Sequence, residues 1–380
     1  MAPKKPTAPP NNSPGDLMDK RRLGRTNLMM SQVGFGSTWI AELPKPQAIE
    51  VIQCAFELGF NYFDTARWDG DSEEKIGQAL QTKKRDQCII ATKTGNRTKR
   101  ESLQDLMVSL KNLQTDCVDI LQLHGIDDEK TLNKAMGEDG VLQTCKQAQR
   151  EGHTKFIGIT GHKPRVLTKA ITTGEFDTVL VPLNVVTPQA LEELIPTAKK
   201  HDVGVVIMKS LSVKTSNLIT CLYQPSLSLI SQEEEEIKTL LGQTTQEQVS
   251  SALQYVLDQD VSGVIAGFKS IAEVETAANA ANQYHNSAPK KHNRFSFELG
   301  NYCRDCGLCM PCPNNINIPA ILRFQMLHDI YGLENWAKKR YGGLEVKAEK
   351  CEHCGQCIQK CPYNLPIESK LEKAKQELTE

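Results

Sequence analysis

The sequence predicts an α/β fold, a (β/α)8 TIM barrel followed by a small, mainly helical domain. From about residue 30 to residue 285, short apolar runs alternate with longer amphipathic stretches, in eight successive pairs. Eight strand–helix pairs in roughly 255 residues match the strand number and the size of this barrel. Most of the apolar runs lack the polar alternation of a half-exposed sheet, so we expect parallel strands that are buried on both faces.

The predicted elements follow one another regularly along the chain. The strands are rich in Val, Ile and Leu and comprise residues 33–37, 61–64, 88–92, 118–121, 154–159, 178–181, 204–208 and 263–266. The helices comprise residues 47–58, 72–80, 103–113, 141–149, 164–172, 189–200, 245–258 and 271–284. An open doubly wound sheet is the alternative, but it usually has a G-x-G-x-x-G turn after its first strand, which this sequence lacks.

The barrel is predicted to occupy residues 20–284, between a tail and a linker. Residues 1–19 are rich in proline and polar side chains, so we expect a disordered tail and no secretory signal. Residues 285–294 are polar and should link the barrel to a second domain at residues 295–372. A formal net charge of −1 gives no reason to expect a nucleic-acid partner, and no apolar run is long enough for a membrane span.

One connection in the barrel, between Lys209 and Thr244, is unusually long and contains the acidic run 233–236. We expect a solvated loop or an extra helix there, because long loops at the barrel mouth often cover active sites.

The second domain carries eight of the 13 cysteines, in two short runs. The first run is Cys303-x2-Cys306-x2-Cys309-x2-Cys312-Pro313, and the second is Cys351-x2-Cys354-x2-Cys357-x3-Cys361-Pro362. The second run has the spacing of bacterial iron–sulfur proteins, so we predict two 4Fe-4S clusters, with about eight iron and eight sulfide ions per chain. Residues 319–331, between the runs, have helical periodicity.

The ligands of the two clusters are predicted to cross between the runs, as in two-cluster ferredoxins. One cluster would be held by Cys303, Cys306, Cys309 and Cys361, and the other by Cys351, Cys354, Cys357 and Cys312. The first run departs from the usual spacing, with two residues before its fourth cysteine. Zinc is the main alternative, because four-cysteine zinc sites also use C-x2-C pairs. The remaining cysteines are expected to be ordinary buried side chains: Cys54, Cys88, Cys117, Cys145 and Cys221.

Three chemically active side chains occur at the carboxyl ends of neighbouring strands, where barrel active sites lie. Asp64 closes the second predicted strand, Lys93 the third and His124 the fourth. Each alone could be structural, as a helix cap, a rim charge or a core histidine. Their occurrence at adjacent strand ends favours one shared pocket.

Seven segments of the predicted barrel, which include Asp64, Lys93 and His124, resemble the aldo-keto reductases. Together with the cysteine runs they resemble the ferredoxin-fused branch of that family. The resemblance covers about residues 20–284. It rests on RRLGRTNLMMSQVGFGS (21–37), NYFDTARWDGDSEEKIGQAL (61–80), IIATKTG (89–95), VDILQLH (118–124), FIGITGH (156–162), VIMKSL (206–211) and VIAGFKSIAEVE (264–275).

The resemblance implies a catalytic tetrad of Asp, Tyr, Lys and His, in which the tyrosine gives a proton to a carbonyl substrate. Asp64, Lys93 and His124 match, but the position expected for the tyrosine holds Asp69, next to Trp68. A carboxylate beside a lysine should be ionised at neutral pH and has no proton to give. Ordinary carbonyl reduction would then require burial to keep Asp69 protonated.

The resemblance also implies NADP(H) as a cofactor. Thr160 follows the fifth strand, where the family often places a serine that holds the nicotinamide carboxamide, and Asn184 matches an asparagine of related sequences. Lys209 lies near the expected pyrophosphate, and residues 267–270 resemble the loop that grips the adenosine 2′-phosphate, with Lys269 and Ser270 as its candidates. Ordinary surface charges are the alternative for both lysines.

The two halves differ in the electron steps that they favour, because a nicotinamide delivers a hydride whereas a cubane cluster moves one electron at a time. We therefore favour an oxidoreductase whose clusters relay electrons between an external electron carrier and a small-molecule substrate or cofactor at the barrel mouth. One alternative is a non-catalytic electron-transfer or redox-sensing protein that uses the barrel as a scaffold. Another is an NADPH-dependent carbonyl reductase with accessory clusters. Because exposed cubanes are oxygen-labile, we expect a cytoplasmic protein.

Overall fold

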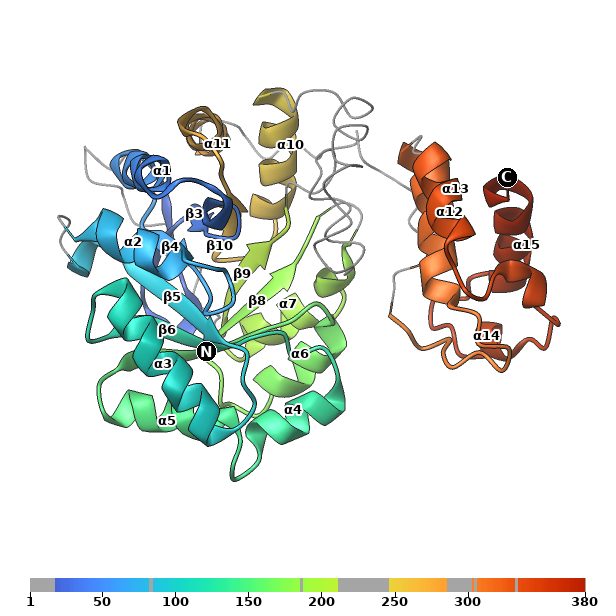
Figure 1. Cartoon of the computed structure of the whole chain (residues 1–380), viewed down its shortest axis with the longest axis horizontal. Coiled ribbons are helices and arrows are strands. Elements are labelled where there is room, and N and C mark those ends of the chain that lie inside the picture. The colour runs from blue at the N-terminus through green and yellow to red at the C-terminus, as the bar shows by residue number, and fades with distance from the viewer. Residues whose placement is uncertain are drawn as a thin grey trace, which may run out of the picture. The chain divides into compact units, whose positions relative to one another are not determined.

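A computed structural model describes residues 18–81, 85–184, 187–210, 246–285, 303, 306–331 and 334–379. They divide into two compact units. The described residues up to 285 form the first unit, and those from 303 onward form the second (Figure 1). Three predicted features lie outside the described residues. They are nearly all of the long connection between Lys209 and Thr244, all of the linker except residue 285, and Cys221.

The first unit is a closed barrel of eight parallel strands, as predicted. In barrel order, beginning with the last strand, these are β10 (Gly263–Gly267), β3 (Val33–Gly36), β4 (Tyr62–Asp64), β5 (Ile89–Thr94), β6 (Val118–Leu123), β7 (Thr154–Thr160), β8 (Thr178–Pro182) and β9 (Gly204–Met208). The register pairs Asp64 with Ala91 and Lys93 with Gln122, so the predicted site residues of neighbouring strands lie at similar heights. Closure of the barrel therefore brings them to one mouth.

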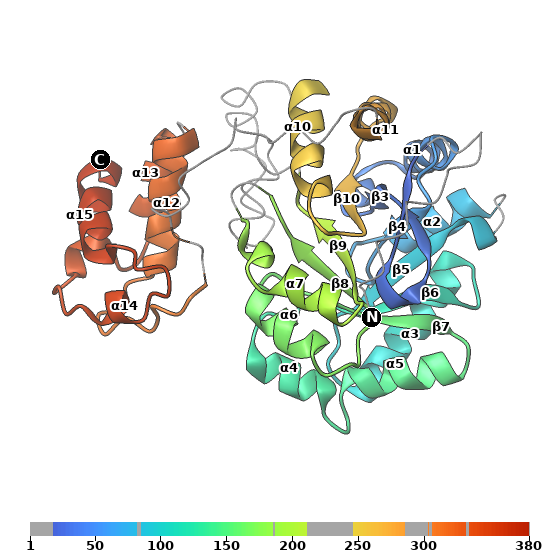
Figure 2. The same ribbon diagram turned by 180° about the vertical axis from the view of Figure 1, so that it is seen from behind.

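Helices surround the barrel, as Figures 1 and 2 show from opposite sides. They are α1 (Lys45–Glu57), α2 (Ser72–Leu80), α3 (Lys99–Leu113), α4 (Glu129–Met136), α5 (Val141–Arg150), α6 (Pro164–Ile171), α7 (Leu194–Lys200), α10 (Gln246–Leu257) and α11 (Ile271–His285). Their apolar faces and the outward-facing strand residues form the large hydrophobic core. A smaller cluster that includes Tyr62, Ile120 and Val206 forms a second core. This double burial explains why the strands read as nearly continuous apolar runs.

Two local predictions differ from the structure. The helix predicted at residues 189–200 is a 3-10 turn, η4 (Gln189–Leu191), followed by α7, with a non-helical backbone at Glu193. Pro196 lies in the first turn of α7, where its missing N–H costs no hydrogen bond, whereas inside a continuous helix it would break one.

The second difference is at the amino end and concerns residues 18 and 19, which were predicted to belong to a disordered tail. Met18 is buried in the core, and the carbonyl of Asp19 accepts a hydrogen bond from the Gln32 amide (2.9 Å). A hairpin of β1 (Lys20–Arg22) and β2 (Met29–Ser31) follows directly. Because Met18 and Asp19 make these contacts, residues 18 and 19 belong to the barrel unit.

The second unit is helical between its cysteine runs, as predicted. It contains α12 (Ile318–Tyr331), α13 (Glu334–Gly342), η8 (Ala348–Lys350), α14 (Gln356–Gln359) and α15 (Ile367–Leu378). Its buried side chains include Ile321, Phe324, Tyr341 and Leu371. Within the described part of the chain, no helix is long and apolar enough to cross a membrane.

Candidate functional site

A cavity of about 300 Å³ opens at the carboxyl ends of the barrel strands. Six of the residues predicted from the sequence line it: Asp64, Asp69, Lys93, His124, Thr160 and Lys209. Trp39 and His162, which were not predicted as site residues, also line it. The structure thus brings most of the predicted barrel site together in one place.

Asp64 and Lys93 form a buried ion pair at the ends of β4 and β5. The Lys93 ammonium also donates to the carbonyl of Thr65 (2.7 Å), and Gln122 Nε2 donates to the second oxygen of Asp64 (2.9 Å). Burial raises the pKa of Asp64 from its ordinary value, and the neighbouring Lys93 charge opposes that rise. Two acceptors therefore hold the lysine in place at the edge of the cavity that it lines.

His124 stands just beyond β6 and is a neutral imidazole at physiological pH. Burial lowers its pKa to about 3, and the positive charges of Lys93 and Arg97 add to that effect. The ring lies against the indole of Trp68, with 5.4 Å between ring centroids. A neutral imidazole can offer one N–H hydrogen bond to a substrate oxygen, but it is not a strong acid.

Asp69 lies on the loop between β4 and α2 and lines the cavity. One of its carboxylate oxygens accepts a hydrogen bond from Ser37 Oγ (3.1 Å). Its neighbour Trp68 is 62% exposed and lies against Gly95, where an added Cβ would come within 1.9 Å of the indole. The loop therefore presents a hydrogen-bonded carboxyl group, and not a phenol, to the cavity.

A buried lysine holds the loop that carries Trp39. The Lys75 ammonium, on α2, donates to the carbonyls of Ile40 (2.9 Å) and Leu43 (2.8 Å) and pairs with Asp71 (2.6 Å). These bonds fix η2 (Ile40–Glu42) beside the mouth. Sequence reasoning missed Lys75, because one lysine in a helix gives no sign that its side chain reaches a distant loop.

The remaining predicted cofactor residues have other partners in the structure. Asn184 Nδ2 donates to the carbonyl of Lys209 (3.0 Å), and its Oδ1 accepts from the Thr187 amide (2.9 Å). The Lys269 ammonium pairs with Glu42 (3.0 Å) and lies over the Trp39 ring, 4.2 Å from its centroid. Ser270 Oγ accepts from the Glu273 amide at the start of α11 (3.3 Å).

Cysteines of both runs meet in the second unit. Cys312 of the first run lines one small cavity with Cys351, Cys354 and Cys357 of the second, and Cys309 lines it too. Burial and the nearby Cys303 and Cys306 thiols raise the pKa of Cys309 to about 12. Gathering thiolates in one place is unfavourable without a cation, and iron removes that cost. The donor set therefore fits thiolate-bound metal.

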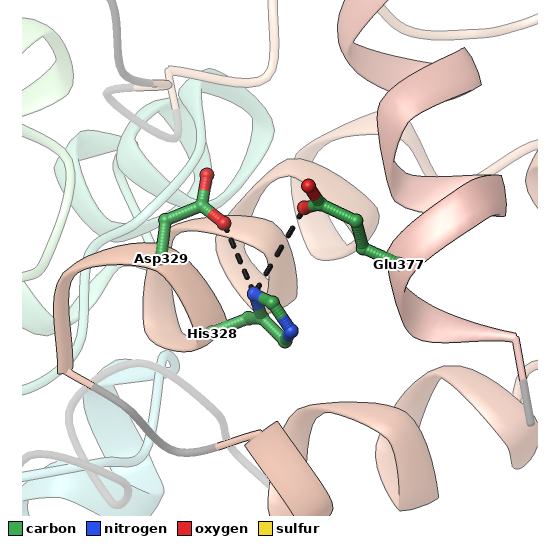
Figure 3. A group of neighbouring side chains, drawn as sticks. All are labelled: His328, Asp329 and Glu377. Atoms are coloured by element: carbon green, nitrogen blue, oxygen red, sulfur yellow. Dashed lines mark hydrogen bonds and ion pairs between the residues drawn. The ribbon is translucent and has the colours of Figure 1, made fainter.

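A second polar cluster joins α12 to α15 (Figure 3). His328 Nδ1 lies 3.0 Å from Asp329 and 3.9 Å from Glu377, and Lys373 pairs with both carboxylates (2.8 and 3.6 Å). Hydrogen bonds, the largest from Lys373, hold the pKa of Asp329 below its ordinary value in spite of burial. Because a lysine already neutralises these acids, we interpret the cluster as a clasp between two helices and not as a metal site.

The barrel and its mouth define a protein of the TIM-barrel class with a polar cavity, joined to a domain with cluster-type cysteines. The chain belongs to the aldo/keto reductase family, whose sequence profile matches residues 32–291. The profile of the 4Fe-4S dicluster domain matches residues 302–365. The protein is therefore an aldo/keto reductase-family oxidoreductase with a fused iron–sulfur domain.

Similar proteins cover the barrel part of the chain. The uncharacterized oxidoreductase YqkF of Bacillus subtilis (strain 168) is 28% identical, and the match covers 70% of this chain and 92% of that protein. L-galactose dehydrogenase of Arabidopsis thaliana is 30% identical over 68% of this chain and 86% of its own length. The solved structure of aldo-keto reductase AKR11C1 from Bacillus halodurans, in its holo form, matches with a TM-score of 0.55 and 24% identity, covering 74% of this chain and 100% of that one. This last likeness supports the fold alone.

Proposed function

We propose that this oxidoreductase relays electrons, through two 4Fe-4S clusters, between an external one-electron carrier and a small molecule at the barrel mouth. The observation that carries this proposal is the composition of the mouth. It keeps Asp64, Lys93 and His124 together but has the carboxyl group of Asp69 where the family resemblance implies a tyrosine. A site that can bind and polarise a carbonyl, but lacks the phenol, is poorly suited to ordinary carbonyl reduction, and this favours a part for the clusters in the reaction.

The barrel residues would act on the substrate by charge and hydrogen bonding. The Lys93 ammonium, held by Asp64, stabilises negative charge that develops on a substrate oxygen. The neutral imidazole of His124 donates a hydrogen bond to the same oxygen. Trp39 lines this space, and Trp68 lies against the ring of His124.

NADP(H) is the cofactor that we propose for the mouth, where it would supply a hydride. Thr160 and Lys209 line the cavity. They would contact the nicotinamide carboxamide and the pyrophosphate. Lys269 and Ser270, at the start of α11, would hold the 2′-phosphate, since helix amino termini favour anions. Lys269 forms an ion pair with Glu42 in the structure, and this pair would have to break for the phosphate to bind. Asn184 would act indirectly, by holding the Lys209 carbonyl.

The two clusters would use crossed ligands. Cys312 with Cys351, Cys354 and Cys357 would hold one, and these four line a small cavity together with Cys309, which we assign to the other cluster. Cys303, Cys306, Cys309 and Cys361 would hold the other. The clusters supply one-electron steps to an external carrier. Because they need reduced thiols and little oxygen, we propose a cytoplasmic location.

The experiment that tests this function follows the visible absorbance of the anaerobic, cluster-loaded protein. We expect NADPH to bleach the clusters of the native chain and to bleach them much more slowly in Lys93→Met, with dithionite reducing both proteins equally. NADPH consumption that requires an aldehyde and leaves the clusters unchanged would instead support a carbonyl reductase with accessory clusters. If NADPH neither binds to the protein nor bleaches the clusters, the nicotinamide version of the proposal is ruled out.

A further inference from the structure

Three polar side chains at the barrel mouth form a connected row, of which Lys209 alone has a part in the proposed function, as the contact for the pyrophosphate. Asp127 follows β6, His162 follows β7 and Lys209 follows β9. His162 Nδ1 lies 3.1 Å from Asp127 Oδ2, and His162 Nε2 lies 3.0 Å from Lys209 Nζ. The imidazole therefore lies between a carboxylate and an amine.

The carboxylate fixes which nitrogen of His162 carries the proton. Hydrogen bonds from His162 hold the pKa of Asp127 below its ordinary value, although burial opposes them. Asp127 Oδ2 accepts the Nδ1–H, so Nε2 is the ring nitrogen that faces Lys209 Nζ. The backbone amide of His162 also donates to Asp127. These two bonds set the ring in one orientation.

The surrounding backbone is shaped to make this row possible. Gly161 lets β7 approach the loop after β6, since an added Cβ would come within 2.4 Å of the Ile126 carbonyl and 2.9 Å of Asp127 Oδ1. Lys209 has a positive φ of 63°, a conformation that is uncommon for lysine. The bond from Asn184 Nδ2 to the Lys209 carbonyl holds that conformation.

Lys209 differs from Lys93, the other lysine that lines the cavity. Lys93 is paired with the carboxylate of Asp64 and also donates to the carbonyl of Thr65. Lys209 instead has a base, His162 Nε2, within hydrogen-bonding distance. A nucleophile within reach of a base that a third group orients is the arrangement that activates amines and hydroxyls for covalent catalysis.

We propose that Lys209 forms a Schiff base with a small aldehyde or ketone in this cavity, with His162 as its base and Asp127 as the positioning residue. His162 Nε2 takes a proton from the Lys209 ammonium, and the free amine attacks the carbonyl carbon. A C–N bond forms as the C=O π bond breaks, and a proton moves from nitrogen to oxygen to give a carbinolamine. His162 then returns its proton to the hydroxyl, which leaves as water, and a protonated C=N bond remains. No electrons are gained or lost in this sequence.

The covalent step deepens the proposed function, because it gives the substrate class as a small aldehyde or ketone, and it rests on that function for this role. Reduction of the imine would leave a stable C–N bond and no free product. The imine therefore serves to hold and polarise the carbonyl compound, and water releases it by reversing the sequence. Formation of the imine itself needs neither the clusters nor NADPH, so it can be tested separately.

The test uses the full, cluster-loaded chain with propanal as the probe and sodium cyanoborohydride to trap the imine. Peptide mass spectrometry then gives the rate of propyl addition at each lysine. We expect Lys209 to react fastest. We expect Lys209→Arg, which keeps the charge, to lose the adduct at that position without altering labelling elsewhere. His162→Gln should slow labelling of Lys209 about 100-fold, in line with loss of a general base, and Asp127→Asn should slow it less.

Two results would overturn the Schiff-base role. One is labelling of Lys209 no faster than that of exposed lysines such as Lys169 and Lys199. The other is unchanged labelling of Lys209 in His162→Gln, which would make the row purely structural. If the adduct forms at Lys209 but NADPH never bleaches the clusters, the electron relay fails while the covalent site stands.

Discussion

Asp69 is the residue that most separates this mouth from an ordinary carbonyl reductase. We expect Asp69→Tyr to gain NADPH-dependent reduction of a simple aldehyde such as 4-nitrobenzaldehyde, because it restores a phenol beside Lys93 and His124. A positioned proton donor contributes about 10²- to 10⁴-fold to rate. Asp69→Phe, of similar size but without the hydroxyl, should not gain this activity. Steady-state NADPH oxidation measures both variants, and a native enzyme as active as Asp69→Tyr would contradict the expectation.

His124 should make the barrel less stable as the pH falls. Its pKa in the folded protein, about 3, lies below the ordinary value of 6.5. Between these two values the unfolded chain binds a proton that the folded chain does not, so stability rises with pH through this window and is lost on acidification. Denaturant unfolding followed by tryptophan fluorescence between about pH 5 and 7 should show a slope approaching 1.4 kcal/mol per pH unit at its acid end. His124→Gln should flatten that slope, and an equal slope in the variant would refute the assignment.

Sequence reasoning found some site residues and missed others for a geometric reason. Asp64, Lys93 and His124 could be predicted because each lies at the end of a strand, and parallel strands of a barrel end at one mouth. The contacts of His162 with Asp127 and Lys209 join positions 35 and 47 residues apart. They depend on how separate loops approach one another, and no local pattern encodes that distance.

At the scale of elements, α2 positions the mouth through Lys75. We expect Lys75→Met to lower the free energy of unfolding by about 2–4 kcal/mol, because it leaves several carbonyls of the η2 loop without their donor. Lys45→Met is the matched control, since Lys45 is exposed and its ammonium makes a long, weak contact of 4.0 Å with the Glu74 carboxylate. That change should stay within about 0.5 kcal/mol. Equal effects in the two variants, measured by denaturant unfolding, would show that the Lys75 contacts contribute little.

Element boundaries were predictable where one signal dominated. The eight strands were found because both of their faces are buried, and α2 begins and ends where predicted. The break between η4 and α7 was missed because the apolar spacing continues across it, while Pro196 sets the new start. The β1–β2 hairpin was missed because strands of three residues are too short for a periodicity.

At the scale of the whole molecule, the two cysteine runs predict how the metal centres depend on each other. We expect about eight iron and eight sulfide ions per chain in the anaerobic protein. Cys312→Ser and Cys354→Ser should impair the same cluster, because both residues line one cavity. Cys361→Ser should impair the other cluster, and Cys54→Ser should impair neither. Iron and acid-labile sulfide assays, with Mössbauer spectra of each variant, measure the outcome. Bound zinc and no acid-labile sulfide in the native protein would contradict the prediction of two 4Fe-4S clusters.

The division of the chain into two units was predictable from its composition alone. The alternation of apolar strands with amphipathic helices ends near residue 285, and the first of the two cysteine runs begins at residue 303. Electron exchange between the units could not be predicted, because it depends on potentials and contacts that no motif specifies. The proposed exchange of electrons between the clusters and the barrel mouth therefore needs a direct measurement.

That measurement is an anaerobic redox titration in both directions. A hydride carries two electrons and each of two clusters accepts one, so about one NADPH per chain should reduce both clusters. In the reverse direction, NADP⁺ added to dithionite-reduced protein freed of dithionite should restore the absorbance and yield NADPH in the same ratio. Clusters that respond to dithionite but exchange no electrons with NADPH or NADP⁺ in either direction would contradict a nicotinamide-coupled relay.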